Sequence, residues 1–426
     1  MENEYRLNIK SDIYCTEDLL GFDKYIEALG KMVTHEGFKT PFCIGIFGKW
    51  GSGKTSFMRL LEKRLSASGS KPFIVPVWFN PWRYQKEEHL IIPFLKTIEI
   101  AIKRRFEKIE KETDKNNPLL SGLQKIRGKL KDVSAAIAYG TTFDAKLGGV
   151  GIAFDTAKAV AREESLSQRR IDEAKRLSEK LTSLYYDIVR ELEDVIDEKS
   201  FRIAVFIDDL DRCLPEKAVE LLEAIKLFLD IAGYLFVIGV DREVVKKGIS
   251  YRYQFFEHRD EKEKEGLVIS PDDYLDKMIQ LPLELPVIEH GRKRKFIEAL
   301  LDDSVEFKKH ADIIEAGVGD NPRTLKRFVN LLAFTVTLAE TLKDNILHDK
   351  FEPKESDEHK ALIKEHFIPI LYIKWSIIVF RYPKEHNTIK GNNKRLIELQ
   401  QLRHRAVKGL QVLTLKRLIR RTSRLR

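Results

Sequence analysis

The stretch GIFGKWGSGKTSFM, residues 45–58, decides the fold of this chain. Within it, residues 48–55 match the pattern G-x-x-x-x-G-K-[ST], which is typical of a phosphate-binding loop. An apolar run at 42–47 precedes the loop and predicts a buried strand, and an amphipathic pattern that begins at Lys54 predicts a helix. A phosphate-binding loop lies between a strand and a helix, and the sequence predicts both at the right places. An ordinary glycine-rich turn would not account for this combination.

Each residue type in this loop has a physical reason to be there. Glycine tolerates backbone angles that a Cβ atom would forbid, so successive N–H groups can surround a phosphate. The Lys54 ammonium is expected to reach the β- and γ-phosphates, and the Thr55 hydroxyl to bind Mg²⁺. We therefore expect ATP and Mg²⁺ as cofactors. The loop motif recognises phosphate and does not determine which nucleotide base is bound. The predicted nucleotide-binding residues are Gly48, Trp50, Gly51, Ser52, Gly53, Lys54, Thr55 and Ser56.

A second motif, RIAVFIDDLDR at residues 202–212, predicts a hydrophobic strand that ends in carboxylates. In P-loop enzymes the first acidic residue after such a strand holds Mg²⁺, so Asp208 is the predicted metal ligand together with Thr55. Asp209 is well placed to orient or deprotonate the attacking water, and Asp211 is the alternative because a turn could bring it round. Acidic residues at strand ends also cap helices, and it is the combination with the loop that favours catalysis.

Two further apolar runs end in polar residues. Residues 72–79 predict a buried strand that is followed by Asn80 and Arg83. These two side chains either take a polar role beside the phosphates or belong to a loop packed on the strand. Residues 234–240 predict another buried strand, followed by Asp241 and Arg242. Asp241 either senses the γ-phosphate or caps a helix, and Arg242 acts within the chain or across a subunit interface.

The pattern from residue 286 onward is helical. The segment NPRTLKRFVN at 321–330 predicts a helix with Pro322 in its first turn. Arg323, early in that helix, is expected to reach a phosphate from a lid domain and so to take part in catalysis. The alternative is a solvated surface arginine.

Together these elements predict an α/β fold, in which the parallel sheet of a P-loop NTPase is flanked by helices and joined by a helical insertion and a C-terminal helical lid region. The apolar spacing within the insertion predicts a long amphipathic helix at 162–197. The expected domains are a lead-in helix at 1–40, the first half of the NTPase core at 41–100, the helical insertion at 101–200, the second half of the core at 201–285, the helical lid at 286–350 and a basic helical region at 351–426.

The positive charge of the chain is concentrated in its tail. The 426 residues have a formal net charge of +9, and residues 381–426 hold 14 lysines and arginines against two acidic residues. The rest of the chain is therefore close to neutral. Helical spacing of the apolar residues in the tail predicts a helix with one basic face. Such a face binds nucleic acid or another anionic surface, or it is simply a solvated face packed on the lid.

Composition also indicates where the protein works. The three cysteines share no metal-ligand spacing, which favours a reducing compartment and no zinc site. The chain opens without the pattern of a signal peptide, and no window reaches the ~18 apolar residues that a membrane span needs. We therefore expect a cytoplasmic protein without an integral membrane segment. The sequence is compatible with a homo-oligomer and does not determine the oligomeric state.

These motifs together resemble the KAP family of P-loop NTPases, a branch of the class that includes the AAA-type and STAND-type ATPases. The resemblance rests on GIFGKWGSGKTS, VWFNPWRY followed by EEHL, VFIDDLDRC, FVIGVDREVV, YLDKMIQLPLELP and NPRTLKRFVN, which span roughly residues 18–335. It implies an acidic strand next to the loop strand, Mg²⁺-dependent NTP hydrolysis and a helical lid. The residues on the family's phosphate, metal, water-polarising and lid-arginine positions are Lys54, Thr55, Asp208, Asp209 and Arg323.

The resemblance also bears on the cellular role. Many family members carry membrane helices between the loop and the acidic strand, whereas this chain has only the stretch 133–160 there, with charged residues in it. Bacterial family members include phage-exclusion proteins, which suggests antiviral defence. The leading hypothesis is an ATPase whose hydrolysis switches conformation or assembly. The alternatives are a nucleic-acid-binding scaffold that holds nucleotide as a structural ligand, and a P-loop kinase.

Overall fold

The computed structural model describes residues 7–67, 72–87, 90–112, 124–125, 127–128, 201–228, 231–253, 270–302, 304–347 and 369–390. The chain divides into two compact units. The first, which we call the sheet unit, comprises Asp23–Trp50 and Lys54–Leu285, and the second, the helical unit, comprises Met1–Phe22, Gly51–Gly53 and Pro286–Arg426. The helix predicted at 162–197 and the basic part of the tail after residue 390 lie outside the described residues.

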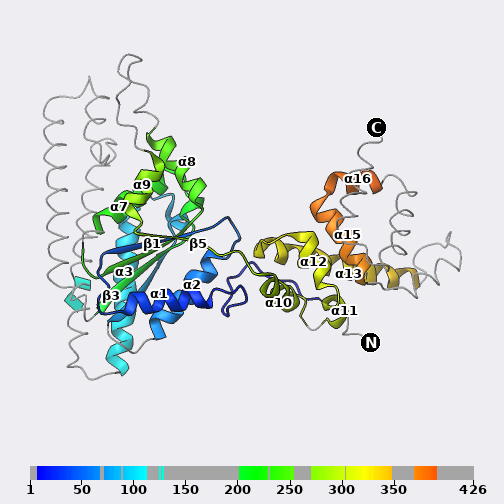
Figure 1. Cartoon of the computed structure of the whole chain (residues 1–426), viewed down its shortest axis with the longest axis horizontal. Coiled ribbons are helices and arrows are strands. Elements are labelled where there is room, and N and C mark those ends of the chain that lie inside the picture. Colours follow the sequence, from blue (N-terminus) through cyan, green and yellow to red (C-terminus); the bar gives the residue numbers. More distant parts are fainter. Residues whose placement is uncertain are drawn as a thin grey trace, which may run out of the picture. The chain divides into compact units, whose positions relative to one another are not determined.

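The sheet unit is built on a parallel sheet of five strands in the order β2-β3-β4-β1-β5. Figure 1 shows this sheet with helices packed around it. Long apolar runs form its three central strands, as expected where helices cover both faces of a sheet. The predicted α/β fold with a parallel sheet flanked by helices is confirmed. In chain order the strands are β1 (Phe42–Phe47), β2 (Phe73–Phe79), β3 (Phe201–Ile207), β4 (Tyr234–Val240) and β5 (Leu281–Glu284).

Alternation of side chains along the strands places helices on both faces of this sheet. In β4, Tyr234 and Phe236 belong to one large apolar core, which also contains residues of α3, α7, α8 and α9. Leu235 is buried outside that core, and Met58 of α2 lies against Gly239. The helices of the unit are α1 (Asp23–Thr34), α2 (Lys54–Ala67), α3 (Ile91–Glu112), α7 (Pro215–Phe228), α8 (Arg242–Tyr253) and α9 (Pro271–Met278).

One expectation about strand order is wrong. The acidic strand β3 does not lie next to the loop strand β1, because β4 pairs with both and separates them. The carboxyl ends of all these parallel strands meet at one edge, so residues after β3 can still reach the loop after β1. At that edge β4 carries Gly239, where an added Cβ would lie 2.7 Å from Met58 Cε and 3.6 Å from Asp208 Oδ1. An added Cβ would thus clash with Met58 and make only ordinary van der Waals contact with Asp208, so the glycine serves the packing of α2 on β4.

The helical unit has its own core, built largely from α10, α12, α13 and α15. Its longest helix begins where the sequence predicts, because Asn321 Oδ1 accepts the backbone N–H groups of Arg323 and Thr324 at 3.0 and 3.2 Å. Pro322, in the first turn, needs no N–H partner there. The helices of the unit are α10 (His290–Leu300), α11 (Val305–Lys308), α12 (Ala311–Val318), α13 (Pro322–Leu347), α15 (Pro369–Arg381) and α16 (Pro383–Lys390).

The apolar helix α15 bears on the question of a membrane span. It has 13 residues, and Phe380 within it packs edge-to-face on Phe328 of α13 at 6.0 Å between ring centroids. Its buried side chains Ile373 and Ile377 likewise belong to the protein interior. Across the described ranges, no helix combines the length and the apolar character needed to cross a bilayer.

Replacing Phe236 by alanine is expected to destabilise the sheet unit. The side chain is fully buried at the centre of β4, and its ring stacks 6.0 Å from that of Tyr234. Lost contacts and the remaining cavity typically lower the free energy of unfolding by ~3–5 kcal/mol. Urea unfolding measures the change, with Leu214→Ala, at a residue that is 58% exposed, as the control expected to shift by less than ~0.5 kcal/mol. Equal unfolding midpoints for the two variants would contradict the position of β4 in the core.

Candidate nucleotide-binding site

The glycine-rich loop connects the end of β1 to the first residue of α2, as its sequence predicts. The N–H of Gly48 donates to the carbonyl of Val240 at 3.2 Å, which ties the start of the loop to the end of β4. Gly51 and Gly53 have φ angles of +79° and +104°, in the left-handed region that side chains with a Cβ rarely adopt. These two glycines therefore meet a backbone requirement of the turn.

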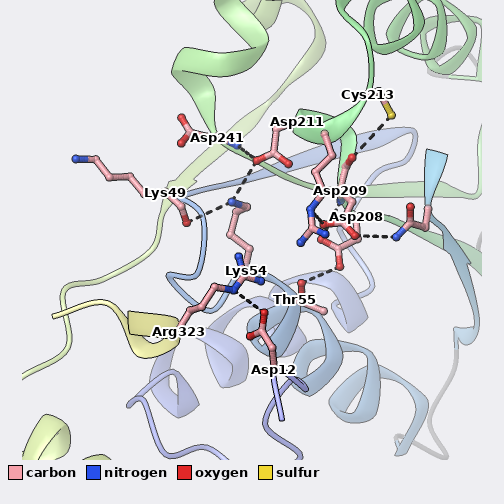
Figure 2. Close-up of polar contacts among 12 residues, drawn as sticks. Asp12, Lys49, Lys54, Thr55, Asp208, Asp209, Asp211, Cys213, Asp241 and Arg323 are labelled. Carbon is pink, nitrogen blue, oxygen red and sulfur yellow. Dashed lines mark hydrogen bonds and ion pairs between the residues drawn. The ribbon is translucent and has the colours of Figure 1, made fainter. Parts of the chain in front are cut away.

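The Lys54 ammonium is buried at the carboxyl edge of the sheet. Its Nζ donates to the carbonyls of Gly48 at 2.7 Å and Lys49 at 3.4 Å, and it lies 3.4 Å from Asp211 Oδ2 (Figure 2). The side chains of Lys54 and Asp211 are only 9% and 2% exposed. Coulombic attraction between charges so shielded from water is stronger than at the surface. The loop lysine thus has an anionic partner from the second motif.

The Thr55 hydroxyl and the Asp208 carboxylate meet directly. Thr55 Oγ1 donates to Asp208 Oδ2 at 2.8 Å (Figure 2). Burial raises the pKa of Asp208 above its usual range, and the hydrogen bond from Thr55 partly opposes that rise. Hydroxyl and carboxylate oxygens are ligands that suit Mg²⁺. The structure therefore brings the two predicted metal ligands together.

This pair fits a magnesium ion that is shared with a nucleotide. Magnesium is usually held by one or two carboxylates together with water and substrate phosphates, and seldom by a cage made of protein alone. Within the described ranges, no group of three or more His, Cys, Asp or Glu side chains could hold a metal ion. Thr55 and Asp208 are the side chains that would supply the protein's share.

Asp209 is fixed by side chains from two loops. Its Oδ2 accepts Asn80 Nδ2 at 2.8 Å, and its Oδ1 forms an ion pair with Arg212 Nε at 2.7 Å. The backbone of Asp209 has φ 61° and ψ 24°, an uncommon conformation for a residue with a Cβ and one that gathers at functional sites. Asn80 therefore helps to orient the Asp209 carboxylate. Sequence reasoning missed Arg212, although its place in the acidic motif was a usable signal.

Asp211, predicted as the alternative catalytic carboxylate, points toward the loop. Its Oδ2 lies 3.4 Å from Lys54 Nζ and accepts the backbone N–H of Asp241 at 2.9 Å. It belongs to the 3₁₀ turn η2 (Leu210–Arg212) that follows β3, so a turn does bring it round as expected. Its contacts are to the loop lysine and to the end of β4.

Asp241 and Arg242 lie at the junction of β4 and α8. The Asp241 carboxylate accepts the backbone N–H of Glu243 at 3.2 Å, as the cap of a helix does. The Arg242 guanidinium forms ion pairs with Asp272 at 3.2 Å and Asp276 at 3.4 Å on α9. In this arrangement Asp241 caps the N-terminus of α8, and Arg242 links α8 to α9 through its ion pairs.

Arg323, the predicted lid arginine, belongs to the helical unit. There its Nε forms an ion pair with Asp12 Oδ2 at 2.7 Å (Figure 2). The N-terminal segment that carries Asp12 is held by Asn330, whose amide accepts Lys10 N at 2.6 Å and donates to Lys10 O at 2.8 Å. A role of Arg323 at the phosphates stays a prediction, as do nucleotide contacts at the remaining loop residues.

A parallel sheet with a glycine-rich loop after β1, a loop lysine and a hydroxyl–carboxylate pair at its carboxyl edge defines a P-loop NTPase. The family profile described as the KAP family P-loop domain matches residues 22–339. This match covers most of the chain, which therefore belongs to the KAP family. The resemblance drawn from the sequence motifs is confirmed.

Three relatives show how far this similarity extends. The phage T7 exclusion protein of Escherichia coli K12 is 22% identical over 337 residues, which cover 76% of this chain and 40% of that protein. An uncharacterized protein of Methanocaldococcus jannaschii is 26% identical over 166 residues, or 36% of this chain and 84% of that one. Human kinase D-interacting substrate of 220 kDa is 31% identical over 65 residues, or 15% of this chain and 4% of that protein. The chain thus spans less than half the length of the phage exclusion protein.

Two solved structures from Aeropyrum pernix also show similarity. The ORC1 protein in complex with DNA matches 81% of this chain and 64% of its own, with 14% identity and a TM-score of 0.35. The ORC2 protein, in ADPNP–ADP complexes, matches 84% and 70%, with 13% identity and a TM-score of 0.38. Such values carry no conclusion about binding or activity.

Replacing Lys54 by alanine is expected to weaken the binding of MgATP at least ~10-fold. The change removes the buried cation of the loop, and a hydrogen bond to a charged group contributes ~1.5–3 kcal/mol. Isothermal titration calorimetry measures the dissociation constant. Lys63→Ala, on the exposed side of α2, is the control and is expected to leave affinity within about twofold. Equal affinities for wild type and Lys54→Ala would contradict the assignment of the loop.

Proposed function

We propose that this chain is a Mg²⁺-dependent ATP hydrolase whose turnover switches its conformation or its assembly. The observation that carries the proposal is the 2.8 Å hydrogen bond from the Thr55 hydroxyl to the Asp208 carboxylate. It joins the two motifs at the place where a P-loop enzyme holds its metal. The KAP family P-loop domain across residues 22–339 supports nucleotide binding independently of that contact.

Binding of the phosphates would fall to the loop and the first turn of α2. Backbone N–H groups of the loop and the N-terminus of α2 attract and orient negative oxygens. The Lys54 ammonium adds a positive charge at the β- and γ-phosphates. Thr55 and Asp208 would hold Mg²⁺, which when bound neutralises charge on the phosphate oxygens. The base is not read by any of these groups, so the preference for ATP is part of the proposal.

Asp209 is the residue that we assign to orient and polarise the attacking water. Asn80 and Arg212 each bond one of its oxygens, and a carboxylate oxygen can accept more than one hydrogen bond. Both oxygens therefore keep the capacity to accept a bond from water. Asn80 Oδ1 is buried and finds no hydrogen-bond partner among the described residues, so it offers a second acceptor nearby. A water that donates to both groups presents its oxygen for attack on the γ-phosphorus, while the bond to the bridging oxygen breaks.

The wider setting of this activity is also a proposal. Antiviral defence is supported by the similarity to the phage T7 exclusion protein, which is 22% identical over 337 residues. A cytoplasmic location, a homo-oligomer and the binding of nucleic acid or an anionic surface by the tail stay predictions from the sequence. The tail after residue 390 lies outside the described residues. Direct binding of the chain to DNA, RNA or an anionic surface tests its role.

Replacing Asp209 by asparagine is expected to lower kcat for ATP by ~10²–10⁴-fold, because an amide cannot take up a proton from water as a carboxylate does. The dissociation constant for MgATP is expected to stay within about threefold, since no phosphate contact is removed. Release of inorganic phosphate under single-turnover conditions measures the chemical step. Asp273→Asn, at an exposed position of α9, is the matched control with unchanged turnover.

The same assay separates the candidate functions. Phosphate release to water by the wild type, lost in Asp209→Asn, supports hydrolysis. Transfer of the phosphoryl group to an added acceptor, with little release to water, would indicate a kinase. Tight MgATP binding without turnover, with or without DNA or RNA, would indicate a scaffold. Full turnover in Asp209→Asn would show that another residue orients the water.

A further inference from the structure

Three oxygen atoms of the sheet unit lie close to the Lys54 ammonium, two as hydrogen-bond acceptors and one as an ion-pair partner. Two carbonyls of the loop, those of Gly48 and Lys49, lie at 2.7 and 3.4 Å from Nζ. The third partner is the Asp211 carboxylate at 3.4 Å. A lysine ammonium has three N–H donors in all, and the two carbonyls accept from two of them. A phosphate that binds this ammonium therefore competes for it with the carbonyls and with the carboxylate.

Asp211 is a buried, anchored partner of Lys54 and not a surface contact. Its side chain is 2% exposed, and the same oxygen that faces Lys54 accepts the backbone N–H of Asp241 at 2.9 Å. That second bond anchors the carboxylate to the end of β4. Surface ion pairs contribute little to stability, but removing one member of a buried pair leaves an uncompensated charge and is strongly destabilising.

The other cation of the site does not compete for Asp211. Arg212 forms its ion pair with Asp209 at 2.7 Å. Each of these two carboxylates thus has one cation, and Lys54 with Asp211 makes a closed, neutral pair. A negatively charged phosphate that approaches Lys54 is attracted by the ammonium and repelled by the carboxylate behind it.

We propose that Asp211 is a positioning residue that holds the Lys54 ammonium and competes with nucleotide phosphate for it, so that Asp211 sets the affinity for nucleotide. The inference rests on the proposed function in one respect, namely that the loop binds nucleotide. It assigns Asp211 a different role from that of water polarisation, which belongs to Asp209. Exchange of one anion for another at Lys54 is the step that nucleotide binding requires.

Asp211→Asn separates these roles, because asparagine keeps the shape and the bond from Asp241 while removing the charge. Binding of MgATP is expected to tighten at least ~5-fold, since the phosphate no longer competes with a carboxylate. The dissociation constant for MgATP, measured by isothermal titration calorimetry, is the readout that carries the inference. Without added nucleotide the melting temperature is expected to fall, and saturating MgATP is expected to restore most of that loss.

Two further variants control the experiment. Asp211→Glu keeps the charge and is expected to bring the dissociation constant back to within about threefold of wild type. A double variant, Lys54→Met with Asp211→Asn, removes both charges, and its melting temperature is expected to recover at least half of the loss caused by Asp211→Asn. This second comparison needs no nucleotide, so it tests the pairing even if Asp211→Asn alone is too unstable for titration.

The outcomes that would overturn the inference are distinct from a failure of the proposed function. Unchanged or weaker MgATP binding by Asp211→Asn would show that the carboxylate does not compete with phosphate. Unchanged binding with turnover lowered ~100-fold would make Asp211 the water-polarising residue instead. No recovery in the double variant would show that Asp211 supports the fold independently of Lys54. Absence of nucleotide binding by the wild type would contradict the proposed function itself.

Discussion

The hydrogen bond between the Thr55 hydroxyl and the Asp208 carboxylate, 2.8 Å long, is the contact on which the site depends. Its two residues come from motifs far apart in the chain, and their strands are not neighbours, because β4 lies between β1 and β3. The contact forms because parallel strands bring their carboxyl ends to one edge of the sheet. A fold that lost this convergence would keep both motifs and lose the site.

Charge pairing at this edge gives each carboxylate a different partner. Asp209 pairs with Arg212, and Asp211 pairs with Lys54. Asp208, by contrast, accepts hydrogen bonds from Thr55 and from the backbone N–H of Asp209, and the described residues provide no ion pair for it. Burial raises its pKa, so a cation at this carboxylate would relieve the cost of keeping it charged. Asp208, which forms no ion pair among the described residues, is therefore the carboxylate that fits a metal ion.

Local patterns in the sequence predict much of the fold. The strands at 42–47 and 234–240 begin and end where their apolar runs do, because a strand covered on both faces needs apolar residues throughout. The order of the strands was not predictable in this way, since it depends on pairing between distant segments. The implied neighbourhood of β1 and β3 was accordingly wrong. The start of α13 at Pro322 was predictable, because capping by Asn321 is a local interaction.

The residue types of the site were easier to predict than their partners. The spacing of the loop motif identifies its glycines, Lys54 and Thr55, and the end of the acidic strand motif identifies Asp208. The structure brings Thr55 and Asp208 into contact. The pairing of Asp211 with Lys54 depends on the turn η2 and on the left-handed backbone of Asp209. Neither feature has a simple sequence signal, since aspartate only tolerates that conformation.

Titration of ATP with and without Mg²⁺, on wild type and on Asp208→Asn, tests most directly the claim that Thr55 and Asp208 form a metal site shared with nucleotide. The account predicts that Mg²⁺ strengthens ATP binding by the wild type and that most of this gain is lost in Asp208→Asn, while binding without Mg²⁺ changes little. An equal gain from Mg²⁺ in both proteins would contradict the account, because the metal would then be held without the Asp208 carboxylate.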